Sequence, residues 1–360
     1  RPPRSTLFPY TTLFRSGTAS AKTLKIQLTF PKTSYDGQIV KMWTDRVTQL
    51  TRGELKFELL SKGEVVGMKE TLEAVDKGLV DGGAAWTHYW SNYHPAAMLF
   101  GSPVAGGGIG LSTKSWLAWY FDNGGKELYD RLWNEMGMNV KGFVMASSGP
   151  EALGWFKEPI KNMDDFRKYR FRTPPGIPGQ TYKDIGIASV SLSGGDILPA
   201  LEKGTIDAAE WCCPKPDSVF GFQKVLKNYY LQGLHQNVVN GDIYINGDVY
   251  NSLTDHQKYA MEIASEAMIT RNITNRAVEN GKALIDLTEN HGVKLWDTPA
   301  DYFTEYMNAA QATLKKNAAD NAFFKEVYEH MTAHAKIVVP FIAQMETSDA
   351  SIGTAFAKQQ

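Results

Sequence analysis

The segment IDAAEWCCPKP, residues 206–216, places a carboxylate, an indole and two adjacent thiols side by side. Such a cluster is typical of a catalytic or metal-binding site. Cys212 and Cys213 lack the C-x-x-C spacing of a redox or zinc motif, and an ordinary disulfide requires Cα atoms farther apart than those of neighbouring residues. We therefore expect both cysteines to be small buried hydrophobic residues, with a strained vicinal disulfide as the alternative.

Three other motifs do not match the chemistry that they suggest. The stretch AGGGIGLSTKS, residues 105–115, fits neither G-x-G-x-x-G nor G-x-x-x-x-G-K-[ST], so it predicts no phosphate site. The stretch ASSGPE, residues 146–151, is not the G-x-S-x-G of a serine hydrolase. His330 and His334 are four residues apart on a predicted helix, without an H-E-x-x-H motif or a third ligand. The sequence therefore predicts no catalytic residues.

Composition narrows the class of protein further. The 360 residues are 43% hydrophobic and 21% charged, with a net charge of −1. This length suggests about two domains, and the balanced charge provides no basic surface for nucleic acid. No apolar run of about 18 residues is present, so we expect a protein that is not embedded in a membrane. The 9 Trp, 16 Tyr and 17 Phe suit an aromatic cleft for a small organic ligand, and core packing explains them equally well.

The N-terminal residues are expected to lie outside the fold. TLFPYTTLFRS, residues 6–16, matches the translation of a common sequencing-adapter stretch, and we interpret residues 1–16 as an adapter-derived artefact. GTASAK, residues 17–22, ends in small residues of the kind that precede a signal-peptidase site, so we interpret it as the remnant of a truncated signal peptide. With only two cysteines, the chain is expected in the bacterial periplasm, although a reduced cytosol fits this count equally well.

Hydrophobic patterning predicts an α/β fold. LKIQLTF, residues 24–30, and LKFELL, residues 55–60, alternate as half-buried strands do, and amphipathic helices follow each of them. LEAVDKGLVDGGAAW, residues 72–86, is echoed by LPALEKGTIDAAEW, residues 198–211, at an offset of 126 residues. This echo predicts two lobes that are built alike.

From Thr254 onward the pattern becomes helical. Thr254 and Gln257 form a capping box ahead of one long periodic segment, and two further helices are expected to about Gln344. The predicted organisation has four parts: lobe I at 23–145 with 237–253 returning to it, lobe II at 146–236, long helices spanning the lobes at 254–345, and a tail at 346–360. The two crossover strands, near 144–147 and 238–244, are the expected hinges.

Taken together, these segments resemble the DctP-type solute-binding proteins of TRAP (tripartite ATP-independent periplasmic) transporters, and most closely the branch that binds 2-oxo acids and lactate. The resemblance covers residues 22–343, and it implies a two-lobed periplasmic-binding-protein fold, type II-like, with long C-terminal helices. It is carried by FPKTSYDGQIVKMWTDRVTQLTRGELKFELLSKGEVVGMKETLEAVDKGLVDGG, GPEALGWFKEPIKNMDDFRKYRFRTPPG, SLSGGDILPALEKGTIDAAEWCCPKPDSVFGFQKV and YYLQGLHQN.

The resemblance also implies the site. Arg172, in the R-x-R-T-P motif, would hold the substrate carboxylate through paired hydrogen bonds. Glu210 would supply a side-chain oxygen, and Trp211 a backbone carbonyl, to a metal ion that touches the ligand. The third family ligand is a glutamine, and Glu151 replaces it here. Two carboxylates and a bound monocarboxylate over-compensate a monovalent ion, so Ca²⁺ is favoured, with Na⁺ as the alternative. Two further alternatives are that Glu151 binds a cationic group of the ligand, and that no metal binds.

Aromatic residues of the other lobe complete the expected site. Trp86, Tyr89 and Trp90 match a segment that faces the cleft in the family. Phe30 and Gln236 are weaker candidates for ligand contact, because simple packing explains each of them equally well.

The function implied is capture of a small organic acid, a 2-oxo or 2-hydroxy monocarboxylate, by closure of the lobes, followed by delivery to the TRAP membrane subunits. The protein is then not an enzyme. The alternatives are a metal-dependent enzyme acting on a 2-oxo acid and a sensor that presents the ligand to a receptor. Members of the branch dimerise through the C-terminal helix, so a homodimer is a further expectation, with a monomer as the alternative. The sequence leaves open which organic acid is bound and the redox state of Cys212 and Cys213.

Overall fold

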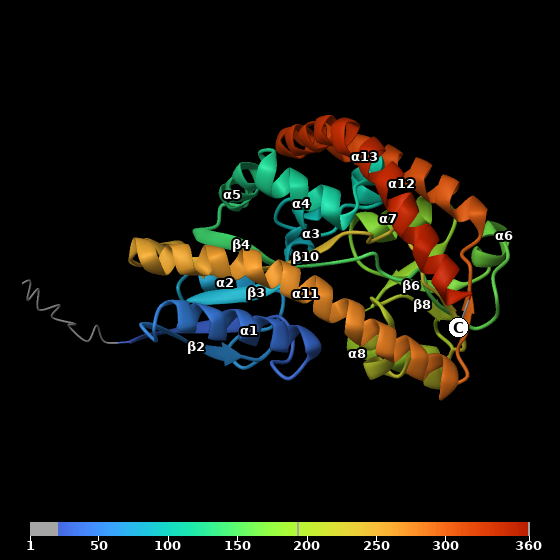
Figure 1. The fold of residues 1–360 in the computed structure, drawn as a ribbon, viewed down its shortest axis with the longest axis horizontal. Coiled ribbons are helices and arrows are strands. Elements are labelled where there is room, and N and C mark those ends of the chain that lie inside the picture. The colour runs from blue at the N-terminus through green and yellow to red at the C-terminus, as the bar shows by residue number, and fades with distance from the viewer. Residues whose placement is uncertain (1–20, 193, 359–360) are drawn as a thin grey trace, which may run out of the picture.

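The structure, a computed structural model, describes residues 21–192 and 194–358. The expectation of an artefact at 1–16 and most of the signal remnant at 17–22 lie outside these residues. The described chain forms two separate sheets with helices packed around them (Figure 1). We call each sheet, with the helices packed on it, a lobe.

The first lobe contains a five-stranded sheet in the order β2-β1-β3-β10-β4. β1, β2 and β3 are parallel, and β10 is antiparallel to both β3 and β4. In β1, Leu24, Ile26 and Leu28 are fully buried, as the predicted alternation requires, but Gln27, expected on the exposed face, is fully buried as well. The strands are β1 (Lys22–Leu28), β2 (Leu55–Leu60), β3 (Gly82–Trp86), β4 (Val140–Ser148) and β10 (Val239–Asn246).

Helices of the first lobe cover this sheet. α1 begins after Ser34, whose side chain accepts the Gly37 N–H, and it buries Trp43 and Val47 in the same core cluster as β1. The helical elements are α1 (Tyr35–Leu50), α2 (Thr71–Asp76), η1 (Thr87–Trp90), α3 (Ala97–Gly101), η2 (Gly106–Gly110), α4 (Thr113–Asp122), α5 (Gly125–Glu135) and α10 (Gly247–Asn251).

The second lobe contains a six-stranded sheet in the order β11-β9-β5-β8-β6-β7. Its strands are β5 (Gly154–Phe156), β6 (Arg170–Thr173), β7 (Ala188–Ser191), β8 (Ala208–Ala209), β9 (Asn228–Tyr230) and β11 (Lys294–Trp296). Its helical elements are α6 (Met163–Phe166), α7 (Ile177–Asp184), α8 (Gly194–Glu202), α9 (Pro214–Phe220) and η3 (Phe222–Lys224). The sequence did not predict β11, because three exposed residues are too few to show an alternating pattern.

Two neighbouring strands carry the chain between the lobes. β4 leads out of the first lobe and β10 leads back, and they pair antiparallel with Val239 opposite Ser148. The register shifts between Gly241 and Asp242. The expected hinge segments lie on these two strands, and their movement stays a prediction.

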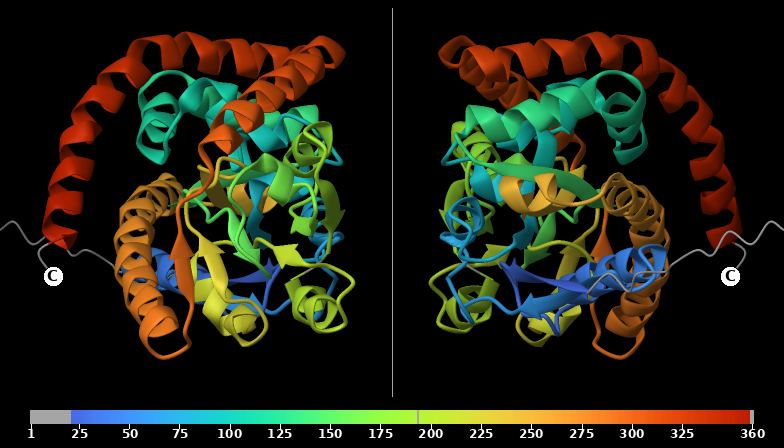
Figure 2. Two further views of the ribbon diagram at one scale, coloured as in Figure 1. Left: turned by 90° about the vertical axis from the view of Figure 1, so that its right-hand side faces the viewer. Right: turned by 90° about the vertical axis from the view of Figure 1, so that its left-hand side faces the viewer.

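Three long helices follow. α11 (Asp255–Glu289) begins at the predicted capping box and contacts α1 and β4 of the first lobe and α9 of the second, so it spans both (Figure 1). α12 (Ala300–Asp320) and α13 (Ala322–Ala357) complete the chain. Residues 346–357, expected as a tail, continue α13, because an existing helix extends without the cost of a new nucleus. Figure 2 shows the C-terminal part of α13 standing away from the body. Within 21–192 and 194–358, no helix has the length and hydrophobicity to cross a bilayer.

Candidate ligand and metal site

Arg172 lies at the centre of the candidate site. β6 pairs with β8 so that Arg172 is opposite Ala209, which brings the next residue, Glu210, against the guanidinium. Arg172 Nη1 donates to Glu210 Oε1 over 2.6 Å and to the Glu210 carbonyl over 2.8 Å. Nε and Nη2 each donate to the Leu192 carbonyl over 3.1 Å. The guanidinium is therefore buried and fixed in orientation, as recognition of a carboxylate requires.

The Trp211 indole covers this guanidinium. The Arg172 Cζ atom lies 5.0 Å from the Trp211 ring centroid, a cation–π distance. The other contact of the indole is with Phe220, at 4.8 Å between centroids. The role of the Trp211 carbonyl as a metal ligand stays a prediction.

Glu151, Glu210 and His235 form a cluster beside Arg172. One potential ligand atom of each residue lies within 4.8 Å of the other two, and all three residues are buried. Glu151 Oε2, Glu210 Oε2 and His235 Nε2 have no hydrogen-bond partner, although Glu210 Oε2 and His235 Nε2 are 3.3 Å apart. Unpaired buried polar atoms are costly. A cation among these three atoms would satisfy all of them.

Electrostatics around Glu151 point to the same conclusion. Burial and the neighbouring Glu210 carboxylate raise the pKa of Glu151 well above its usual value, and Arg276 opposes this shift. A metal ion would reverse the effect, because it stabilises the ionised carboxylate.

His235 is a site residue that the sequence analysis missed. It lies in LHQN, directly before Gln236, the residue predicted from this segment. His235 Nδ1 lies 3.2 Å from the Tyr182 hydroxyl, which in turn contacts the Tyr302 hydroxyl at 3.1 Å. These partners orient the imidazole with Nε2 toward the carboxylates, which is the usual arrangement of a metal-binding histidine. A histidine without a motif partner gives no sequence signal for this role.

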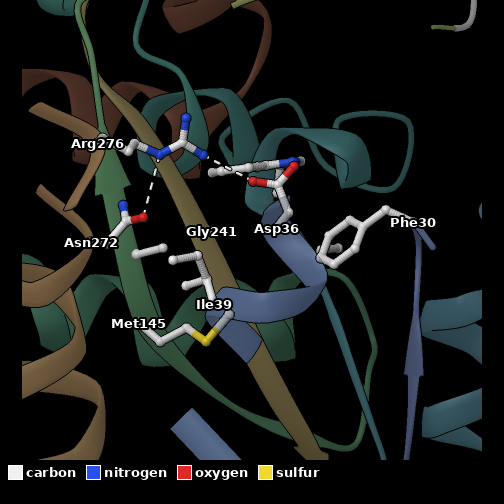
Figure 3. A pocket seen from close by; sticks show the side chains of 10 residues that line it. Phe30, Asp36, Ile39, Met145, Gly241, Asn272 and Arg276 are labelled. Atoms are coloured by element: carbon white, nitrogen blue, oxygen red, sulfur yellow. Dashed lines mark hydrogen bonds and ion pairs between the residues drawn. The ribbon is translucent and has the colours of Figure 1, made fainter. Parts of the chain in front are cut away.

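A second guanidinium, Arg276, adjoins the site in a pocket between the first lobe and α11 (Figure 3). Arg276 Nη2 donates to Asp36 Oδ1 over 2.9 Å, and Nε donates to Asn272 Oδ1 over 3.3 Å. Its Cζ atom lies 5.7 Å from the Trp86 ring centroid. The lining residues are Phe30, Asp36, Ile39, Ala85, Trp86, Met145, Ala146, Gly241, Asn272 and Arg276. No sequence motif marks Arg276, which lies mid-helix in α11.

The predicted site residues Phe30, Trp86, Tyr89 and Gln236 lie in different surroundings. Phe30 and Trp86 line the pocket of Arg276. Tyr89 is half-buried, and burial raises the pKa of its hydroxyl. Charged groups of both lobes also act on this pKa, among them Asp36 of the first lobe and Arg172 of the second. Gln236 is buried and contacts the site through its backbone carbonyl, which accepts the Glu151 N–H over 3.0 Å.

Trp90 lies deeper than the other predicted aromatic residues, and its contact with the ligand stays a prediction. It is 1% exposed and packs edge-on against Tyr93 and Tyr244 in the core of the first lobe, outside the described pocket. The tight η1 turn points the Trp90 side chain inward. The resemblance of this segment to the family does not show which way each ring points.

Comparison with known proteins identifies the family. The family model for bacterial extracellular solute-binding proteins, family 7 (DctP), matches residues 28–321. The chain belongs to the DctP family. A monocarboxylate 2-oxoacid-binding periplasmic protein from Nostoc sp. is 33% identical over 298 residues, which cover 81% of this chain and 78% of the relative. These matches confirm the predicted family, so this DctP protein is a solute-binding protein.

Solved structures confirm the predicted fold class. A TRAP transporter solute-binding protein from Bordetella bronchiseptica, with calcium and picolinate bound, is 25% identical and gives a TM-score of 0.86 over 94% of this chain and 99% of its own. A protein from Colwellia psychrerythraea, with calcium and pyruvate bound, is 22% identical with a TM-score of 0.84, covering 93% and 99%. One from Pseudoalteromonas atlantica, with sodium and pyruvate, is 21% identical with a TM-score of 0.82, covering 92% and 98%.

Proposed function

We propose that this DctP protein is the periplasmic component of a TRAP transporter and captures a small 2-oxo or 2-hydroxy monocarboxylate together with a cation. The observation that carries the proposal is the convergence of Arg172 with three unpaired buried ligand atoms, from Glu151, Glu210 and His235. The relative from Nostoc, a 2-oxoacid-binding protein, supports the ligand class.

In this proposal two groups bind the ligand, the Arg172 guanidinium and the cation. A ligand carboxylate would replace Glu210 Oε1 at the Arg172 guanidinium, since both are oxygen acceptors for the same N–H groups. Glu210 would then turn to the cation, together with Glu151 and the Trp211 carbonyl, and His235 would lie at its edge. The cation supplies positive charge that holds the carboxylates and the ligand together.

Charge counting favours a divalent ion. Glu151, Glu210 and a monocarboxylate carry three negative charges when ionised, and Arg172 carries one positive charge. A divalent cation balances this sum, whereas a monovalent ion leaves one negative charge in a buried site. Calcium in the Bordetella and Colwellia structures supports this choice, and sodium in the Pseudoalteromonas structure keeps the alternative open.

Closure of the lobes would complete the site. Phe30 and Trp86 from the first lobe face the pocket of Arg276, and α11 carries Arg276 between the lobes. Closure around a ligand is the expected movement of a periplasmic binding protein. In this proposal the protein makes and breaks no covalent bond, and the closed form is what the membrane subunits recognise.

We also propose a homodimer through α13. Ile337, Phe341, Met345, Ile352 and Phe356 are each more than half exposed, and their spacing places them along one helical stripe. The Bordetella neighbour forms a dimer, which supports a second copy of this chain as the partner that covers the stripe.

The test of the ligand proposal is calorimetry on residues 22–360 with pyruvate, lactate and longer 2-oxo acids, with calcium, with sodium and with a chelator. We expect binding with calcium and its loss with chelator. Binding that is indifferent to chelator, or preference for a cationic ligand, would overturn the cation-bridged site. Chemical conversion of the acid, followed by NMR, would instead favour an enzyme.

A further inference from the structure

The two cysteines lie directly behind the ligand site. Cys212 and Cys213 follow Trp211, are 8% and 9% exposed, and have Sγ atoms 2.6 Å apart. Both face the same guanidinium, with Arg276 Nη1 at 3.5 Å from Cys212 Sγ and 3.7 Å from Cys213 Sγ. Their backbone N–H groups both donate to Asp217 Oδ1, over 3.1 and 3.2 Å. The backbone therefore holds the two thiols together on one side of the segment.

The pair is connected to the proposed cation site in two ways, one through the backbone and one through electrostatics. The Cys212 carbonyl accepts the Ala152 N–H over 2.7 Å, next to Glu151. Cys212 and Cys213 are also among the groups that shift the pKa of the Glu151 carboxyl. On its other side the pair meets Arg276, which pairs with Asp36 of the first lobe. A change in the thiols thus reaches both a cation ligand and the contact between α11 and the first lobe.

We propose that Cys212 and Cys213 are a redox-modifiable vicinal dithiol whose oxidation to a disulfide weakens cation-dependent ligand binding. The binding part rests on the proposed function. In the step, each thiol gives up one proton and one electron as the Sγ–Sγ bond forms. The oxidant is a disulfide, of the small-molecule or periplasmic oxidoreductase class, and it takes up the two electrons and two protons to become two thiols.

The short distance between the Cα atoms of neighbouring residues makes the Cys212–Cys213 disulfide strained and therefore reversible. Neighbouring Cα atoms are about 3.8 Å apart, below the about 4.4–6.8 Å of ordinary disulfides. A strained disulfide is easily reduced, which is a property of labile and regulatory bonds. The ring that forms contains the peptide bond between the two cysteines, so it displaces the Cys212 carbonyl from the N–H of Ala152, the residue after Glu151. Loss of such outer contacts lowers metal affinity by about 10–100-fold.

The experiment compares one protein in two redox states. Residues 22–360 are equilibrated with oxidised glutathione or with a phosphine reductant, and intact mass and thiol labelling report the disulfide without any ligand. Calorimetry then measures calcium alone, and calcium with pyruvate, in both states. The matched control is the double variant Cys212→Ser/Cys213→Ser, whose affinity has no oxidant dependence.

We expect oxidation to remove two hydrogens without forming a covalent dimer, and to weaken calcium-dependent binding about tenfold. Because the coupling is reciprocal, calcium with pyruvate would make the disulfide easier to reduce by the same factor, about 30 mV for tenfold, in glutathione redox buffers. Free thiols after oxidation, or a disulfide that changes neither binding nor its own potential, would overturn the proposal. If the disulfide forms on oxidation but the reduced protein binds neither calcium nor any of the acids, the result would instead reject the proposed function.

Discussion

Arg172 Nη1 donates to the Glu210 carboxylate over 2.6 Å, and both side chains are almost completely buried. In the proposed function, the Arg172 guanidinium is the hydrogen-bond donor to the ligand carboxylate, and Glu210 keeps it in position. Arg172→Lys keeps the charge but loses the planar fork, so we expect ligand affinity to fall about 100-fold, from charged hydrogen bonds worth about 1.5–3 kcal/mol. Calorimetry with the best-binding acid measures this.

The same strand offers a matched control. Arg170 is exposed and pairs with Asp207 at the surface, two residues before Arg172. Arg170→Lys should leave affinity within about twofold, because exposed pairs contribute little. Equal losses in the two variants would mean that Arg172 acts only through the structure of β6.

In the proposed site, the charge of Glu151 decides which cation is preferred. Glu151→Gln removes one negative charge and keeps a side-chain oxygen, so we expect calcium-dependent binding to weaken at least about tenfold. Sodium should support binding in the variant better than in the native protein. The measurement is ligand affinity in calcium and in sodium, with exposed Glu158→Gln as the control. An unchanged cation preference would remove Glu151 from the cation site.

The fold was predictable wherever sequence patterns are local. The apolar face of β1 and the capping box at Thr254 both appear in the structure as expected. β11 was not predictable, because it is held by pairing with β9 across a long separation in sequence. The extension of α13 beyond 345 was missed for a related reason, since nothing local marks its end.

The candidate site was predictable only through motifs. Arg172 and Glu210 lie in stretches that match a family pattern, and the structure brings them together. His235 and Arg276 reach the site from a loop and from mid-helix, and only the tertiary fold shows their unpaired atoms and buried partners. Trp90 packs in the core of the first lobe, and a matching segment does not specify which of its rings turn into the core.

Asp217 anchors the segment that carries the cysteines. Its Oδ2 accepts Trp155 Nε1 and the Tyr229 hydroxyl, both at 2.9 Å, and its Oδ1 accepts the N–H groups of Cys212 and Cys213. Burial raises the pKa of Asp217 to about 7, while these donors oppose the shift. Asp217→Asn places an amide N–H₂ against donors, and we expect the free energy of unfolding to fall by about 2–3 kcal/mol.

Urea denaturation measures this loss, and exposed Asp122→Asn is its control. The ligand affinity of Asp217→Asn should fall as well, because residues 211–213 lose their anchor. A variant as stable as the native protein would show that the carboxyl is protonated and donates within the cluster.

His88 makes stability depend on pH. Burial lowers its pKa to about 4, from 6.5. Between these values the unfolded chain binds a proton that the folded protein does not, so this contribution is complete above pH 6.5 and is lost as the pH falls. The stability difference between the native protein and His88→Gln should therefore shrink by about 2 kcal/mol from pH 7.5 to pH 5. Urea denaturation at both values tests this, and a constant difference would contradict it.

The apolar stripe of α13 sets the oligomeric state in our proposal. Ile337 is 72% exposed and Phe341 is 66% exposed, one helical turn apart. Burial of an apolar side chain of this size is favourable by about 1.5–3 kcal/mol relative to exposure in water. A second copy of the chain that covers these side chains is therefore stabilised by about that amount for each of them. We expect Ile337→Glu/Phe341→Glu to convert a dimer into a monomer in light scattering, with its thermal stability nearly unchanged. Ala343→Glu adds the same charge on another, exposed side of α13, away from the stripe, and should remain dimeric. A native protein that is monomeric at high concentration would reject the interface.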